Sequence, residues 1–229
     1  MRTITAFTFE QLNEIFTATA PSDGAGWCYR GQADNTWLLV PRAGRPEYAW
    51  HDLARFKEWR RQAIAYYPEL PADDWECLAI AQHYGLATRL LDWTWNPLVA
   101  TYFAINSEPA VDGAVYCLLA HKLEDVEEKT FEEITHVARY SPRAIHRRIL
   151  QQAAFFTYHP QPTKSLEHEE LLENPGILQV VIPARMKASL LASLNMYGIN
   201  NVTLFPDLEG LSRHSNWVTQ GITRLRGGT

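Results

Sequence analysis

The sequence has few cysteines and no long apolar run. Its three cysteines, Cys28, Cys77 and Cys117, are odd in number and far apart, which argues against both a disulfide framework and a cysteine zinc site. No apolar stretch approaches the roughly 20 residues that a membrane-spanning helix needs. The first residues also lack the continuous apolar core of a secretory signal. We therefore expect a cytoplasmic protein with no membrane partner.

Metal-ligand spacing and excess positive charge are also missing. The eight histidines show none of the paired spacings that are typical of metal sites, so we predict no metal. The formal net charge is -5, which argues against a generally basic surface for nucleic acid. A functional site must therefore be sought in local motifs, because the overall composition points to none.

The composition predicts one well-cored domain. Hydrophobic residues make up 46% of the 229 residues and charged residues 21%, as in an ordinary globular protein. Apolar periodicity alternates between strand-like and helix-like segments, but without the regular order or the glycine-rich turn of a doubly wound nucleotide fold. We expect a single α+β domain over residues 1–229, with a mixed or antiparallel sheet and surrounding helices.

Local signals place the expected elements. Helices are predicted after the Thr8–Gln11 capping pattern and over 46–67, 74–84, 97–104, 141–151 and 186–196. Strands are predicted over 27–32, 88–94, 113–119, 153–158, 177–182 and 202–205, with a loose C-terminal tail.

The stretch 82–104 concentrates polar and aromatic side chains between apolar segments. It contains Gln82, His83, Thr88, Arg89, Asp92, Trp93, Thr94 and Asn96. Asn96 and Pro97 form a helix start, where backbone N–H groups favour an anion such as a phosphate. Taken singly, each residue has a structural interpretation, such as a buried Arg89–Asp92 ion pair, a core histidine or a packed tryptophan. Taken together, they predict a ligand site.

Two motifs resemble those of a known family, the FRG domain. Tyr29-Arg30-Gly31-Gln32 is similar to its Phe-Arg-Gly signature, and residues 82–94 with Asn96-Pro97 resemble its longest motif. Arg148-Ile149, Gln152, Phe156-Thr157 and residues 204–208 resemble its later motifs in the expected order. The resemblance extends from about Trp27 to Leu211.

A more distant resemblance to the ADP-ribosyltransferase superfamily implies a related fold and NAD as substrate. By that resemblance Arg30 holds NAD, Thr94 orients the ribose, and the helix start at Asn96 adds charge stabilisation. The implied catalytic residues are Arg30, Asp92, Thr94 and Gln152. The implied ligand-binding residues are Tyr29, Arg30, Gly31, Gln32, Gln82, His83, Thr88, Arg89, Trp93 and Asn96.

The sequence departs from the transferase pattern around residues 151–156, where no acid occurs. Three acids remain as alternatives for the catalytic carboxylate: Asp92, Asp207 and Glu209. We therefore expect either an ADP-ribosyltransferase or NAD glycohydrolase, or a non-catalytic domain that senses a nucleotide or partner in the same cleft.

The enzyme hypothesis implies partners that the sequence does not name. An ADP-ribosyltransferase would modify a protein or a nucleic acid, as a toxin or phage-defence effector with a neutralising partner. A metal-dependent nuclease using His83, Asp92 and Asp207 is the least favoured alternative, since no spaced carboxylate pair supports it.

Overall fold

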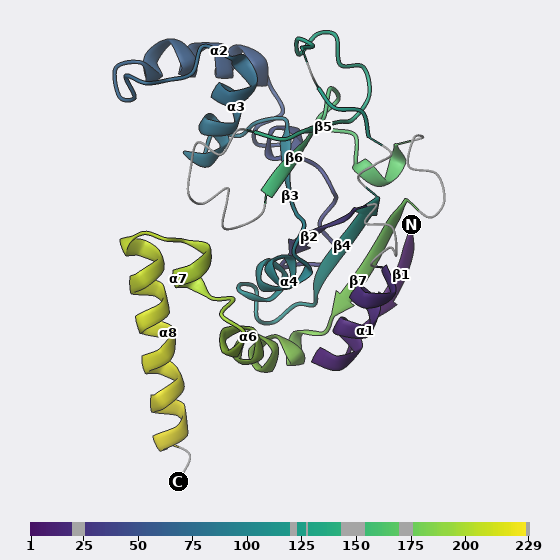
Figure 1. Cartoon of the computed structure of the whole chain (residues 1–229), viewed down its shortest axis with the longest axis vertical. Coiled ribbons are helices and arrows are strands. Elements are labelled where there is room, and N and C mark those ends of the chain that lie inside the picture. Colours follow the sequence, from purple (N-terminus) through teal and green to yellow (C-terminus); the bar gives the residue numbers. More distant parts are fainter. Residues whose placement is uncertain (20–25, 120–122, 127, 143–153, 170–175, 228–229) are drawn as a thin grey trace.

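A single seven-stranded mixed sheet organises the described residues into one α+β domain (Figure 1). The computed structural model describes residues 1–19, 26–119, 123–126, 128–142, 154–169 and 176–227. Across the sheet the strands run in the order β1 (Arg2–Thr5), β7 (Ile177–Ile182), β4 (Gly113–Leu119), β2 (Trp27–Gln32), β3 (Leu90–Thr94), β6 (Ala154–Tyr158) and β5 (Ala138–Tyr140). The predicted fold class is confirmed.

The sheet is antiparallel except at one edge. There β1 lies parallel to β7, with Ile4 opposite Val180. The strands β1 and β5, which are short and lie at the two edges of the sheet, were not predicted from the sequence. Each pairs with a longer, apolar neighbour, so their extended conformation depends on partners distant in sequence.

Helices cover one face of the sheet in two groups. Around the first core cluster lie α1 (Phe9–Thr19), α4 (Pro97–Ile105), α6 (Lys187–Met196) and α7 (Asn201–Leu204). Around the second lie α2 (Asp52–Ala63) and α3 (Asp74–His83), which pack on β3, β6 and β5. Figure 1 shows α2 and α3 at one end of the sheet and α4 over its middle.

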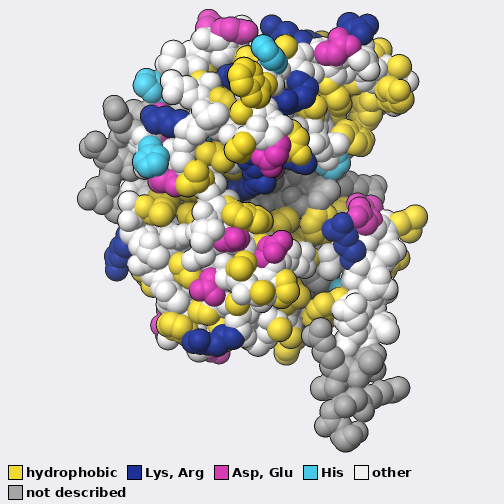
Figure 2. Space-filling view, turned by 180° about the vertical axis from the view of Figure 1, so that it is seen from behind, with side chains coloured by type: hydrophobic (Ala, Val, Ile, Leu, Met, Phe, Trp, Pro, Cys, Tyr) yellow, Lys and Arg dark blue, Asp and Glu magenta, His cyan; other side chains and the backbone are white. Residues whose placement is uncertain are grey.

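The opposite face of the sheet is covered by loop residues and by a short 3₁₀ helix, Leu166–His168. Leu39 and Leu166 are both buried there against strand residues such as Trp93 and Leu118. Seen from behind the view of Figure 1, the surface is hollowed between the part that carries α2 and α3 and the part that carries α8 (Leu208–Gly227) (Figure 2).

The helix boundaries around the predicted site follow their capping residues. Asp73 caps α3 by accepting a hydrogen bond from the Glu76 N–H, and Gly85 follows the helix with a φ of 93°. Asn96 caps α4 by accepting from the Leu98 N–H, and Pro97 occupies the first helical position. These capping predictions are confirmed, so the stretch 82–104 is a helix end, a strand and a helix start.

The prediction of one helix over 46–67 was too long. The α2 helix begins at Asp52, because His51 before it adopts a left-handed φ of 52° that helical geometry does not allow. The helix predicted over 141–151 falls largely on 143–153, outside the described residues.

Two predictions near the C-terminus were wrong. Residues 202–205 were expected as a strand, but Asn200 and Thr203 form a reciprocal capping box that starts the helix α7. The expected loose tail is the helix α8 (Leu208–Gly227), whose start Asp207 caps by accepting from the Gly210 N–H. Figure 1 shows α8 extending beyond the sheet. None of the described helices is both long enough and apolar enough to cross a membrane.

Candidate functional site

A cleft of about 310 Å³ opens between α3 and α4, over the strands β2 and β3. Eight of the predicted site residues line it: Tyr29, Arg30, Gly31, Gln82, His83, Asp92, Trp93 and Thr94. The remaining lining residues are Ala79, Val99, Ala100, Phe103 and Phe156. The cleft thus gathers both motifs of the FRG resemblance, which lie some sixty positions apart along the chain.

The cleft forms where two neighbouring strands diverge. The direct pairing of β2 with β3 consists of Tyr29 opposite Thr94, whereas β2 pairs with β4 over its whole length. Arg30 lies beside this divergence, and its Nη1 donates a hydrogen bond of 2.9 Å to the main-chain oxygen of Asp92. A side-chain donor therefore bridges the two strands beyond their last paired residues.

The Asp92 carboxylate is held from two sides at the floor of the cleft. Its Oδ1 accepts a hydrogen bond of 2.9 Å from Nε2 of Gln82, and its Oδ2 lies 3.4 Å from Nη1 of Arg30. The Asp92 side chain is nevertheless 59% exposed, against 17% for Arg30. The carboxylate is fixed in orientation and still open to a ligand.

Arg30 is a largely buried cation. Burial lowers the pKa of its guanidinium, and the negative charge of Asp92 opposes that effect. Its Nε is buried and has no hydrogen-bond partner among the residues that the structure describes. Since an arginine still carries its proton at neutral pH, the cleft holds a positive charge with incomplete compensation.

Aromatic rings form the walls around this polar floor. Phe156 lies opposite Asp92 on the neighbouring strand β6, and Phe103 projects from α4. Neither Phe103 nor Phe156 was predicted as a site residue. Helical spacing from the start of α4 carried a signal for Phe103, whereas Phe156 reaches the cleft only through the pairing of β6 with β3. Val99, Ala100 and Phe103 fall on one side of a helix that starts at a predicted site.

Gly31 contributes close packing to the site. A Cβ on Gly31 would collide with the backbone of Ala100 and Ala104 and lie 2.9 Å from Cβ of Phe103. The absence of a side chain therefore lets α4 press against β2 and brings Phe103 to the cleft.

Thr94 has a structural contact as well as a place in the cleft. It is only 5% exposed, and its Oγ1 accepts a hydrogen bond of 3.1 Å from the Asn96 N–H. Asn96 in turn uses its side chain to cap α4, and it is not among the residues that line the cleft. Asn96 therefore serves the start of α4 and does not itself line the cleft, and the expected charge stabilisation stays a prediction.

Trp93 connects the cleft to a buried polar chain behind the sheet. Its Nε1 donates a hydrogen bond of 3.0 Å to Oγ1 of Thr157, which lies 2.9 Å from Nε2 of His159. Burial, with a smaller effect of Arg30, lowers the pKa of His159 to about 3. His159 is therefore neutral in the folded protein at physiological pH.

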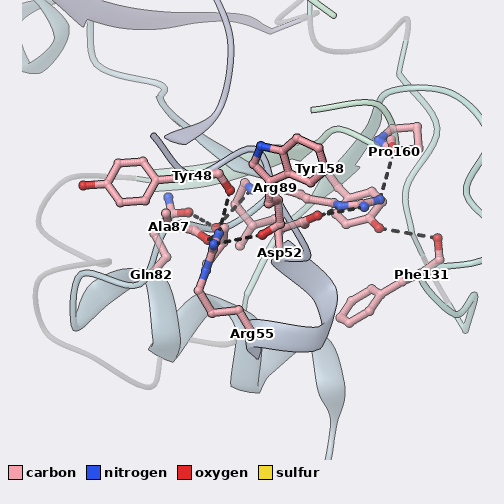
Figure 3. Close-up of polar contacts among 12 residues, drawn as sticks. Tyr48, Asp52, Arg55, Gln82, Ala87, Arg89, Phe131, Tyr158 and Pro160 are labelled. Carbon is pink, nitrogen blue, oxygen red and sulfur yellow. Dashed lines mark hydrogen bonds and ion pairs between the residues drawn. The ribbon is translucent and has the colours of Figure 1, made fainter. Parts of the chain in front are cut away.

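Arg89 has a structural role away from the cleft. Its Nε and Nη2 donate to Asp52 at 2.5 and 3.0 Å, and its Nη1 donates to the carbonyl of Pro160 at 2.8 Å (Figure 3). The Arg89–Asp92 ion pair that the sequence allowed as a structural alternative does not form, because each residue pairs elsewhere, and Arg89, predicted to bind the ligand, does not line the cleft. Burial acts to lower the pKa of Arg89, but its bonds to Asp52 and Tyr158 outweigh that effect and raise it.

The other predicted residues divide into supporting and undescribed ones. Thr88 is 2% exposed and contacts Gln82, and Gln32 is 3% exposed and donates to the carbonyl of Trp37. Neither lines the cleft. Gln152 lies outside the described residues.

Of the three acids that the sequence left open, Asp92 alone lines the cleft. Asp207 caps α8, and Glu209 forms an ion pair with Arg213 on the same helix. Within the described residues, no three His, Cys, Asp or Glu side chains group as metal ligands. The cleft therefore offers one carboxylate, one arginine, an amide and aromatic rings.

Comparison with known proteins gives one family match. Residues 25–113 match the family model of the FRG domain, which covers the first signature and the long second motif. The later motifs, beyond residue 113, stay a prediction. No significant match was found among curated proteins or solved structures.

Proposed function

We propose that this FRG-domain protein binds NAD in the cleft and cleaves the bond between nicotinamide and ribose, passing ADP-ribose to a macromolecular acceptor or to water. The observation that carries the proposal is the placement of Asp92. An exposed carboxylate stands in a cleft beside a buried arginine, with aromatic rings on its walls.

The chemistry of the bond favours such a site. As the C1′–N bond breaks, nicotinamide leaves with the electron pair and the ribose develops positive charge. A nucleophile then forms a bond to C1′ and loses a proton. A carboxylate near the developing cation stabilises it electrostatically, as in glycoside cleavage. In this proposal Asp92 provides that charge, and its two bonds fix its position before the ligand enters.

Arg30 and the aromatic side chains bind the substrate in this scheme. The guanidinium of Arg30, which lines the cleft, favours an anionic group, and a pyrophosphate meets that requirement. Phe103, Phe156 and His83 supply flat surfaces for the nicotinamide ring. Thr94, at the strand end, remains the proposed contact for the ribose.

The proposal is tested by incubating the purified protein with NAD and following nicotinamide release. Asp92→Asn keeps the shape of the side chain but removes its charge, and we expect release to fall by about 100-fold or more. The matched control is Asp125→Asn, which removes a carboxylate that is also paired with an arginine, Arg139, outside the cleft. The control should keep the parent rate.

A second candidate, binding without turnover, has its own observation. The Asp92 carboxylate already has two partners, which would suit a residue that only shapes a binding site. That function predicts no nicotinamide release, but an NAD-dependent rise in the melting temperature that Arg30→Gln abolishes. If NAD gave no nicotinamide release and no rise in melting temperature, both candidates would be refuted.

A further inference from the structure

Gln82 reaches the Asp92 carboxylate through one particular orientation of its side-chain amide. Nε2 donates to Oδ1 of Asp92 at 2.9 Å, while Oε1 accepts a hydrogen bond from Oγ1 of Thr88. If the amide were turned over, its oxygen would face the carboxylate oxygen, and two acceptors would be in contact. The orientation therefore matters for Asp92.

The Thr88 hydroxyl has its own direction fixed by the backbone. Its Oγ1 accepts a hydrogen bond of 3.1 Å from the Leu90 N–H, at the start of β3. Because that oxygen already accepts, its proton is available to donate to Gln82. Thr88 is 2% exposed, so water does not compete strongly for either bond. Donation thus runs from the backbone to Thr88 and on to the oxygen of Gln82.

We infer that Thr88 is a positioning residue that acts through Gln82: its hydroxyl fixes the amide so that an N–H always faces Asp92. Thr88 does not line the cleft, so a ligand bound there would meet Gln82 and Asp92 and not Thr88. The inference rests on the proposed function for its kinetic consequence. It replaces the expected role of Thr88 in binding NAD directly.

The first test measures the amide itself and needs no activity. The side-chain NH₂ signals of Gln82 are identified in a ¹H–¹⁵N spectrum by their loss in Gln82→Glu. In Thr88→Val, which keeps the shape and removes the hydroxyl, these signals should move, whereas Thr88→Ser should keep them in place. Unchanged Gln82 signals in Thr88→Val would overturn the inference.

The matched control is Thr101→Val. Thr101 is fully buried, and its hydroxyl donates to the carbonyl of Pro97 within α4. The substitution therefore removes a buried threonine hydroxyl that has no contact with Gln82. The Gln82 signals and the rate of nicotinamide release should both stay at their parent values, and movement of the signals would count against the specificity of the Thr88 effect.

The second test is kinetic. Losing one oriented hydrogen bond to Asp92 should lower kcat about tenfold in Thr88→Val, with KM changed by less than about twofold, and Thr88→Ser should restore kcat. In an Asp92→Asn background the Thr88→Val change should have no further effect on kcat, because its target is gone. A tenfold loss that persists in that background would indicate general structural damage and overturn the inference.

A further variant covers the case in which Thr88→Val does not fold. Gln82→Met removes the amide and leaves Thr88 and its backbone bond intact, and it should lower kcat as much as Thr88→Val is expected to. An unchanged kcat in Gln82→Met would overturn the inference. If the parent releases no nicotinamide, the proposed function fails, and the NMR test still decides the role of Thr88.

Discussion

Among the arginine–aspartate pairs of the described residues, Arg89–Asp52 and Arg30–Asp92 are of opposite character. Arg89 and Asp52 form a two-pronged pair at 2.5 and 3.0 Å, with side chains 18% and 10% exposed. The side chains of Arg30 and Asp92 meet through one contact of 3.4 Å, and the Asp92 side chain is 59% exposed. We call the Arg89–Asp52 pair the closed pair, because both of its side chains are largely buried, and the Arg30–Asp92 pair the open pair, because it lines the cleft.

The comparison separates an ion pair that stabilises the fold, Arg89–Asp52, from an ion pair that is a candidate for binding a ligand, Arg30–Asp92. Arg89 ties the start of α2 to the end of β6, since it also bonds the carbonyl of Pro160 (Figure 3). Arg55 extends this network to the carbonyls of Tyr48 and Ala87. Arg30 has a buried Nε without a partner among the described residues. A saturated pair serves structure, and an unsaturated pair is the better candidate for binding.

The largest change in stability is expected when the Arg89–Asp52 pair is broken. Asp52→Ala leaves the Arg89 guanidinium buried without its carboxylate, so we expect the free energy of unfolding to fall by about 3 kcal/mol or more. Urea denaturation followed by circular dichroism measures the change. Asp125→Ala, which breaks a more exposed two-pronged pair with Arg139, is the control and should cost about 1 kcal/mol. Equal losses in the two variants would contradict the distinction.

A smaller effect concerns His159, which lies close to both arginines. The main-chain N–H of His159 donates a hydrogen bond of 3.0 Å to the main-chain carbonyl of Arg89. Burial of the His159 ring, with a smaller effect of the Arg30 charge, lowers the pKa of the imidazole to about 3. Between pH 6.5 and 3 the unfolded chain therefore binds a proton at His159 that the folded chain does not. Acidification from pH 7 to pH 5 should cost about 2 kcal/mol of stability through this residue.

The measurement compares the parent with His159→Gln at both pH values. The parent should lose about 2 kcal/mol more free energy of unfolding than the variant does between pH 7 and pH 5. Carboxylates elsewhere contribute equally to both proteins and cancel in the difference. A difference that does not change with pH would mean that His159 titrates normally in the fold.

The smallest change in the free energy of unfolding is expected for the open pair, Arg30–Asp92. Asp92→Asn removes an exposed charge, so the free energy of unfolding should change by less than about 1 kcal/mol, even though nicotinamide release is expected to collapse. Thermal and urea unfolding of the same sample used in the assay would check this. A loss as large as that of Asp52→Ala would make both pairs structural and remove the basis of the comparison.

Much of the fold near the cleft could be predicted from local signals. The caps at Asp73 and Asn96 and the turn at Gly85 fixed the helix ends on both sides of β3. Of the eight predicted site residues that line the cleft, Gln82 and His83 lie in the last turn of α3 and Thr94 ends β3, so local signals place these three. Whether these residues bind NAD is what the proposed assay tests.

What the sequence could not predict depends on contacts between distant residues. Arg89 and Asp92 are close in sequence, but a partner 37 positions away, Asp52, takes Arg89 from it. The helix α7 was mistaken for a strand because Val202 and Thr203 favour strands, whereas the capping residue Asn200 decides the outcome. Phe156 enters the cleft only through the pairing of β6 with β3.

The divergence of β2 from β3 gives the sheet an unusual seam. Two groups of strands, β1-β7-β4-β2 and β3-β6-β5, are each joined by continuous main-chain hydrogen bonds. Where the two groups meet, beyond the pair of Tyr29 with Thr94, the side chain of Arg30 donates to the main-chain oxygen of Asp92 in place of a main-chain donor. An anion that drew Arg30 toward itself would therefore take away a hydrogen bond that joins the two ladders. Cohesion of the sheet and the binding of such an anion would compete for the same guanidinium.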